Sequence, residues 1–363
     1  MSGHTGTQGG DLRSVSSVDL GVATTRSSWL LTALCLVCVA TALCLRPERY
    51  LLLSIKYFGT FLGLLPVLLV VGLGLTALVY GGPRPTRFMV HILKERGPAA
   101  ARVVLLFFLG IIAFTTFRIT IPEIVPYYAD PMLADLDRWL HGVDPWVWTH
   151  GIVSEPASML VFKAYMSWWF MQWLGVVLFV AFWNSPARRI RYLWAFALTM
   201  MLCGTVLPIM LSSSGPIFYD RFYGGSRFAG VLAALMADPY ALPVRFAASY
   251  LLDAHDSGSS ALGSGITAMP SMHVAIVTLN AFFLTGFGRR WAVAGWSFAA
   301  LILFGSVYTG WHYAVDGYLS ILVVSLLWYL TGRFVLPASG QQASDVAQQA
   351  SDTGLAAPNP APR

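Results

Sequence analysis

The sequence predicts an all-α membrane protein, a polytopic bundle of about eight transmembrane helices. Hydrophobic residues make up 56% of the 363 residues and charged residues only 11%, whereas a water-facing domain carries roughly 25% charged residues. The mean hydropathy is +0.65, so most of the chain has lipid as its solvent. The apolar residues also come in runs of the length needed to cross a bilayer, which is about 20 residues.

The apolar runs define the candidate spans. The run at 28–45 contains a small-residue segment, Ala40-Thr41-Ala42, typical of a signal-peptide cleavage site, but the polar region before the run is too long, so we expect an uncleaved helix. The candidate spans are residues 28–45, 51–80, 102–118, 156–183, 190–211, 271–287, 291–309 and 312–335.

Polar segments flank the spans at both ends of the chain. Residues 1–27 are rich in Gly, Ser and Thr, and residues 337–363 in Ala, Gln, Ser and Pro, so we expect disordered tails. The basic clusters at 188–191 and 289–290 lie on the same side as both tails, and cytoplasmic loops collect Lys and Arg. We therefore predict a multi-pass cell-membrane protein with both termini in the cytoplasm. The net charge of +6 reflects this topology and does not indicate nucleic-acid binding.

Two long segments, about 119–155 and 212–270, fall on the opposite, outer side. Leucines at helical spacing in LADLDRWLHG (133–142) predict a helix that lies flat at the membrane interface. Its charged residues are expected on a solvated face, with headgroup binding as the alternative. These residues are Asp130, Asp135, Asp137 and Arg138.

Two histidines fall at equivalent places, because His273 and His312 each open an apolar helix. The span 271–287 runs inward and 291–309 returns outward, so both histidines lie at the same outer face. His312 and Asp316 are four residues apart and share a helix face. The carboxylate can accept a hydrogen bond from one ring nitrogen and leave the other basic.

The same helix starts are suited to binding an anion. Free backbone N–H groups at a helix N-terminus attract negative charge, and Ser271 can cap its helix or donate to a phosphate oxygen. Two histidines and one aspartate could also form a metal-ligand set, but the PSMH context favours an anion. We expect no metal and no cofactor. The four cysteines lie in apolar runs and predict neither disulfides nor a zinc site; they are Cys35, Cys38, Cys44 and Cys203.

AMPSMH at 268–273 and TGWHYAVDG at 309–317 resemble the second and third signature motifs of the type-2 phosphatidic acid phosphatase superfamily. LADLDRWLHG and SSSGPIFYD (212–220) look like its inositolphosphotransferase branch, which includes the inositol phosphorylceramide synthases. The resemblance covers about residues 100–335. It implies a six-helix phosphatase-type core at 101–336, after N-terminal transmembrane helices and a basic loop at 28–100.

The resemblance implies a metal-independent phosphotransferase or phosphatase. His312 would be the nucleophile that forms a phosphohistidine, Asp316 would orient it, and His273 would serve as acid and then base. The substrate would be a lipid phosphate ester at the outer face. Transfer of a phosphoinositol headgroup and hydrolysis of a lipid phosphate or polyprenyl pyrophosphate remain open, and a non-enzymatic transporter is the alternative from another class.

One basic residue of the family pattern is missing. The superfamily usually has Arg six residues before the nucleophilic histidine, where this chain has Ser306, and its first Lys/Arg motif has no match. A transferring phosphoryl group still needs positive charge. Arg221 is the first candidate because it follows a span that ends on the active face, and Arg227, Arg118 and Lys163 are further candidates. The expected substrate-binding residues are Ser271, Tyr219, Arg221 and Arg118.

Overall fold

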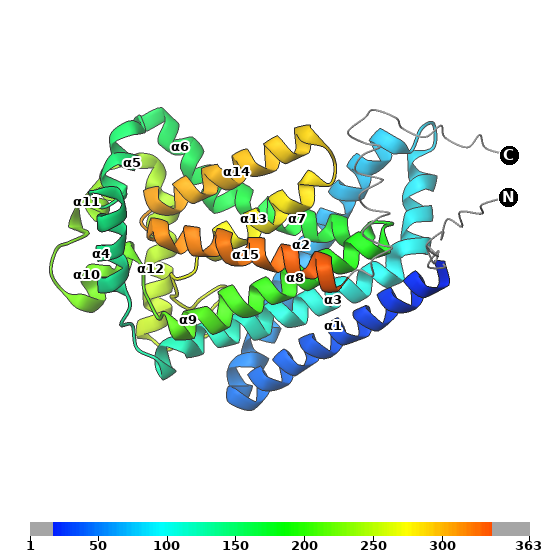
Figure 1. Ribbon diagram of the computed structural model, residues 1–363, viewed down its shortest axis with the longest axis horizontal. Helices are drawn as coiled ribbons and strands as arrows, with labels where there is room; N and C mark the ends of the chain where they lie inside the picture. The colour runs from blue at the N-terminus through cyan, green and yellow to red at the C-terminus, as the bar shows by residue number, and fades with distance from the viewer. Residues whose placement is uncertain (1–16, 336–363) are drawn as a thin grey trace, which may run out of the picture.

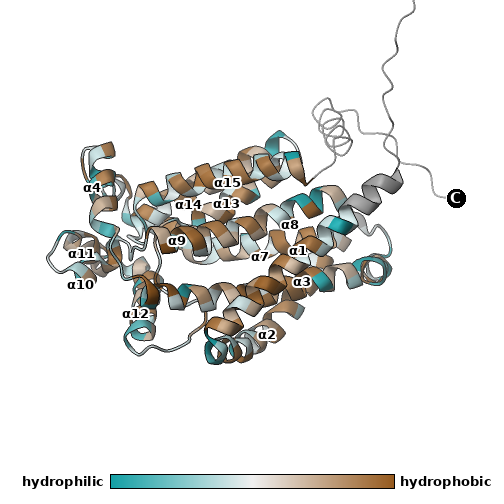
Figure 2. Ribbon diagram, turned by 60° about the horizontal axis from the view of Figure 1, so that its bottom comes forward, coloured by the Kyte–Doolittle hydropathy of each residue, from teal (hydrophilic) through white to brown (hydrophobic). Residues whose placement is uncertain are grey.

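The computed structural model describes residues 17–335, which form helices and connecting loops with no strand among them. Seven helical segments in this part of the chain are long and apolar enough to cross a membrane, and a bent helix pair brings the number to as many as eight. The predicted all-α membrane bundle is confirmed. Figure 2 shows hydrophobic residues along the long helices.

Three long helices open the bundle: α1 (Ser17–Leu45), α2 (Pro47–Tyr80) and α3 (Pro85–Ile124). Residues 17–27 are therefore helical where we expected a disordered tail, and the rest of both predicted tails lies outside the described residues. The basic segment before residue 102, expected as a loop, is also helical. Pro85 stands in the first turn of α3, where its missing N–H costs nothing.

Five spans follow. In two of them, a π-helical turn joins two α-helices into one continuous segment. These are α6 (Glu155–Lys163) with α7 (Trp169–Phe182), and α8 (Pro186–Met201) with α9 (Leu207–Met210). The last three are α13 (Met272–Thr285), α14 (Arg289–Tyr308) and α15 (Ala314–Phe334). The 14 residues of α13 span about 21 Å, less than the roughly 30 Å hydrocarbon core, and α13 packs against α14, α15, α7 and α8.

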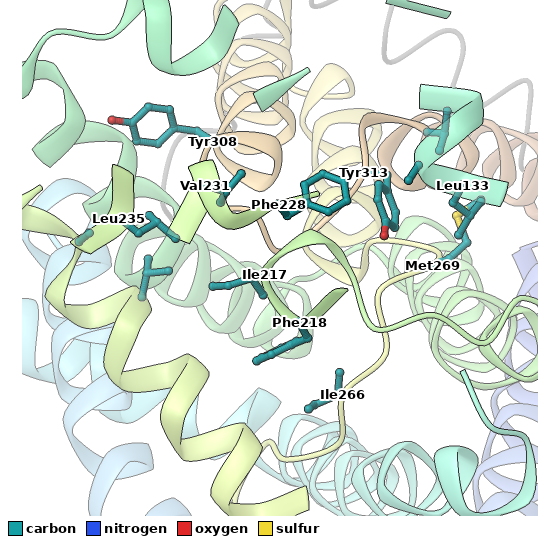
Figure 3. Packing of buried hydrophobic residues seen from close by; sticks show 14 of the residues in the cluster. Leu133, Ile217, Phe218, Phe228, Val231, Leu235, Ile266, Met269, Tyr308 and Tyr313 are labelled. Carbon is teal, nitrogen blue, oxygen red and sulfur yellow. The ribbon is translucent and has the colours of Figure 1, made fainter. Parts of the chain in front are cut away.

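Five short helices gather at the end of the bundle opposite the start of α1 (Figure 1). We call them the helical cap: α4 (Asp130–His141), α5 (Trp146–Ile152), α10 (Pro216–Tyr223), α11 (Ala229–Ala237) and α12 (Leu242–Asp256). They share one buried hydrophobic cluster with the segment before α15 (Figure 3). Leu133 of α4, Phe218 of α10 and Tyr313 are each at most 2% exposed. The two long loops of the sequence are thus a packed layer that fixes the residues around His312.

Candidate active site

His312 lies in the short segment between α14 and α15 and is 6% exposed. Its ring nitrogen Nδ1 is 2.9 Å from the carbonyl oxygen of Ala268 and 3.3 Å from Oδ2 of Asp316. A carbonyl and a carboxylate only accept hydrogen bonds, so Nδ1 carries the proton and Nε2 keeps its lone pair. The structure brings the predicted pair together, although His312 precedes the helix that contains Asp316.

The protonation state of His312 follows from its surroundings. Burial, with a smaller contribution from the charge of Arg118, lowers the pKa of His312 from 6.5 to about 3, against an opposing hydrogen bond to Ala268. His312 is therefore neutral near pH 7. The neutral imidazole is the form that can act as a nucleophile or a base, because protonation would occupy the lone pair on Nε2.

His273 occupies the second residue of α13 and faces His312, with 6.0 Å between the two ring centroids. Its ring stacks on Tyr165 at 4.3 Å and an interplanar angle of 16°, and contacts Trp169 at 4.1 Å. The indole N–H of Trp169 also donates to the backbone carbonyl of His273 at 3.0 Å. Tyr165 belongs to the π-helical turn between α6 and α7, a type of turn that is frequent at functional sites. Aromatic packing thus holds His273 beside His312.

Both histidines line one cavity of about 510 Å³, within the range typical of small-molecule sites. Most of the remaining lining is aliphatic and aromatic. Trp311 also lines it, and its indole Nε1 is buried with no hydrogen-bond partner among residues 17–335.

Arg118 of α3 brings a positive charge to this cavity. Its Nε donates to Thr267 Oγ1 at 3.0 Å, and its guanidinium lies 5.7 Å from the ring centroid of Phe114. Neither terminal nitrogen forms a hydrogen bond within the described part of the chain. Gly265 has φ of 99°, and a Cβ there would come within 2.7 Å of the Arg118 backbone, so only glycine lets the loop pack this closely. Arg118 is therefore held in place with its two terminal nitrogens free for a ligand.

The other predicted substrate-binding residues lie elsewhere. Ser271 is fully buried, and its hydroxyl accepts from the Val274 N–H at 3.4 Å as the N-cap of α13. Arg221 pairs with Asp256 at 3.4 Å, and both side chains are more than half exposed. Tyr219 stacks on a neighbouring tyrosine of α10. None of these three lines the cavity that the histidines share.

The N-terminus of α15 binds the side chain of Asp137, which we expected on a solvated helix face. Asp137 is 2% exposed and accepts hydrogen bonds from the N–H groups of Ala314 at 2.8 Å and Val315 at 3.1 Å. Asp316 accepts from the Tyr313 N–H at 3.1 Å. The first N–H groups of this helix, expected to bind an anion, therefore satisfy the two carboxylates. Asp137 fixes the start of the helix that carries Asp316.

Asp130, also expected in solvent, is fully buried and joins three segments of the protein. Its carboxylate accepts from the N–H groups of Ser214 and Gly215, both at 2.8 Å, and from the hydroxyls of Tyr223 at 3.1 Å and Tyr313 at 2.9 Å. Gly215 has φ of 91°, and a Cβ there would lie 2.4 Å from the Trp311 carbonyl oxygen. Asp130 thus ties the 212–215 loop to the residue next to His312.

Replacing Asp130 with asparagine should lower the free energy of unfolding by about 3 kcal/mol, because the amide NH₂ would face buried donors. Denaturant titration in mixed micelles measures this change. Asp135→Asn is the matched control on the same helix: Asp135 is 73% exposed and pairs with Arg227, so its loss should cost less than about 1 kcal/mol. Equal stabilities of the two variants would contradict the role of Asp130.

Among residues 17–335, no three His, Cys, Asp or Glu side chains come together as a group that could hold a metal ion. The ionisable groups of the site that line the cavity are the imidazoles of His312 and His273 and the guanidinium of Arg118. A basic group, a second imidazole and a fixed cation around one cavity are the parts needed for attack, proton transfer and charge neutralisation at a phosphate.

Comparison with known families agrees with this geometry. The sequence model described as the PAP2 superfamily matches residues 131–330. No significant match was found among curated proteins or solved structures. The matched region begins in α4 and ends in α15, so it includes both histidines and most of the helical cap. It leaves out α1, α2 and α3, and with them Arg118.

Proposed function

Because the chain belongs to the PAP2 superfamily and is a membrane phosphatase or phosphotransferase of that family, we propose that it acts on a lipid phosphate ester through a phosphohistidine at His312. The observation that carries the proposal is the placement of His312. Its Nδ1 is held by Asp316 and the Ala268 carbonyl, and its neutral ring lines a cavity shared with His273 and Arg118.

In the first step, Nε2 of His312 attacks the phosphorus atom, and the bond from phosphorus to the leaving oxygen breaks. His273, which enters this step as the imidazolium stabilised by the bound phosphate anion, gives its proton to that oxygen and becomes neutral, so the leaving group departs as an alcohol. Asp316 stabilises the positive charge that develops on the His312 ring. Arg118 pairs with the phosphoryl oxygens, for which its planar guanidinium is well suited.

In the second step, water or an alcohol attacks the phosphohistidine and gives its proton to His273. The phosphorus–nitrogen bond breaks and His312 returns to its neutral form. Water yields hydrolysis and a lipid alcohol yields transfer, so both outcomes share one intermediate. The mostly apolar lining of the cavity and the helical cap above it favour a lipid acceptor, and thus a transferase. The inositolphosphotransferase branch is the form of transferase that the sequence motifs favour.

We place the active site on the extracytoplasmic side of the cell membrane. Met269 and Tyr313, close in sequence to His273 and His312, belong to the buried cluster of the helical cap, while α1 begins at the opposite end of the bundle (Figure 1). Arg289 and Arg290 begin α14, next to the end of α13 that lies away from both histidines, and basic residues between spans collect on the cytoplasmic side.

The test is product analysis with the purified protein in vesicles, with EDTA present. Phosphatidic acid or phosphatidylinositol serves as donor, with and without a long-chain lipid alcohol. We expect a new phosphorylated lipid that appears only with the alcohol, and unchanged turnover in EDTA. Free phosphate alone would establish hydrolysis instead of transfer, and the absence of any product from either donor would refute the proposed activity.

A further inference from the structure

The cavity at the histidines continues along α2, a helix outside the region that matches the family. One face of α2 forms a wall of this cavity. Apolar side chains of α3 and α7 also line this part of the cavity, among them Phe108 and Leu174. The residues that α2 contributes are Tyr57, Thr60, Phe61, Leu64, Leu65 and Leu68.

The length of this wall along α2 matches the hydrocarbon thickness of one bilayer leaflet. Tyr57 and Leu68 are eleven residues apart, or about 16 Å along a helix, and half of a hydrocarbon core is about 15 Å. The two faces of α2 also differ in exposure. Leu64 and Leu68 are half-buried, whereas Leu62 and Val67 are 64% and 57% exposed and do not line the cavity.

At the end near the histidines, this wall is polar and is held by hydrogen bonds to neighbouring segments. The Tyr57 hydroxyl accepts from the Gly263 N–H at 3.1 Å and lies 2.8 Å from Thr115 Oγ1. The Lys56 ammonium donates to the Ser260 carbonyl at 2.5 Å. These contacts fix α2 to the 257–265 loop, which leads towards Thr267 and Arg118. The site therefore has a polar end at the histidines and an apolar end about one leaflet deep.

We propose that this apolar part binds one hydrocarbon chain of the lipid phosphate, extended along α2 from Tyr57 towards Leu68. The phosphate then lies at Arg118 and His312, and the chain lies in the leaflet on the same side. In this arrangement α2 sets the chain-length preference of the enzyme. The inference rests on the proposed function, because the occupant is the substrate of that reaction.

Leu68→Trp tests the proposal by filling the deep end of the wall. It should lower kcat/KM for dipalmitoyl phosphatidic acid by at least about tenfold, because an indole in the path of the chain displaces the phosphate from His312, and a misplacement of about 1 Å can cost about 10²-fold. The water-soluble dibutanoyl analogue should react as with the unmodified protein. Leu62→Trp, the same substitution on the lipid-facing side of α2, should leave both substrates unaffected. Equal losses for both substrates, no loss for either, or the same loss in Leu62→Trp would overturn the chain site.

Photolabelling separates this inference from the proposed reaction. Phosphatidic acid with a diazirine at the end of one acyl chain is reconstituted with the unmodified protein, irradiated and mapped. We expect saturable label at Leu64, Leu65 or Leu68 that unlabelled dipalmitoyl phosphatidic acid displaces and that Leu68→Trp reduces. Label that does not saturate, or that lies on Leu62 and Val67 alone, would refute the chain site even if turnover is normal. Saturable label without turnover would retain the chain site and refute the proposed reaction.

Discussion

Replacing His312 with glutamine should abolish turnover of the lipid phosphate, with a loss of at least about 10⁴-fold in kcat. Glutamine has a similar length and can still donate to Ala268 and Asp316, but its amide has no basic nitrogen to attack phosphorus. Loss of Nε2 therefore removes the covalent step and leaves the surrounding hydrogen bonds available. Release of phosphate or transferred headgroup from phosphatidic acid and phosphatidylinositol measures the effect.

His255→Gln is the matched control for this substitution. His255 is an exposed histidine of α12 whose ring contacts Tyr127 and Phe222 and does not line the cavity, so kcat should stay close to that of the unmodified protein. Acid-labile phosphate on the unmodified protein after rapid quench, absent from His312→Gln, should accompany the loss. A folded His312→Gln protein that keeps its turnover would exclude His312 as the nucleophile.

The membrane spans and the pairing of His312 with Asp316 could be predicted from sequence because both depend on local patterns. Apolar runs of about 20 residues predict membrane-spanning helices regardless of the segments around them. Two polar residues four positions apart in the sequence can contact each other across one helical turn. The return of α14 to the end where α13 begins then places His273 beside His312. Each of these steps needs only the order of elements and their lengths.

The helical cap shows where this reasoning fails. Leucines 133, 136 and 140 suggested the apolar face of α4, but Leu136 and Leu140 are 39% and 49% exposed. The buried face consists of Asp130, Leu133, Ala134 and Asp137, which follow the i, i+3, i+4, i+7 spacing of a buried stripe. The two aspartates are buried because they accept from backbone N–H groups and tyrosines of distant segments. These hydrogen-bond donors lie far from α4 in the sequence, so the local sequence pattern of α4 gives no indication of them.

The choice between Arg221 and Arg118 as the phosphate clamp depends on distant contacts in the same way. Arg221 and Arg118 both stand near the ends of helices close to the active face, and sequence order favoured Arg221. The structure instead pairs Arg221 with Asp256 at the surface and places Arg118 in the cavity, held by Thr267 and Gly265 of a loop some 150 residues away. Only tertiary packing distinguishes the two arginines.

Arg118→Ala should therefore lower kcat/KM by about 10² to 10³-fold, the usual effect of removing one group that stabilises transition-state charge. The expectation is strong here because Asp137 already occupies the first N–H groups of α15. The N-terminus of α15 therefore contributes little positive electrostatic potential to the cavity. A charged side chain within a membrane protein also has a functional role in most cases. Arg118→Lys should recover only part of the activity, since an ammonium keeps the charge but loses the two-pronged contact with phosphate oxygens.

Inhibition by orthovanadate gives a second readout that does not depend on the lipid. Its inhibition constant should rise in Arg118→Ala, because vanadate takes the geometry of the phosphoryl group in transfer and needs the same cation. Arg221→Ala, a change at an arginine exposed on the surface and paired with Asp256, should keep both the turnover and the vanadate affinity of the unmodified protein. If Arg221→Ala loses activity while Arg118→Ala retains it, the cation is supplied by α10 and not by α3. The helices that precede the family-matched region would then contribute no charge to the reaction.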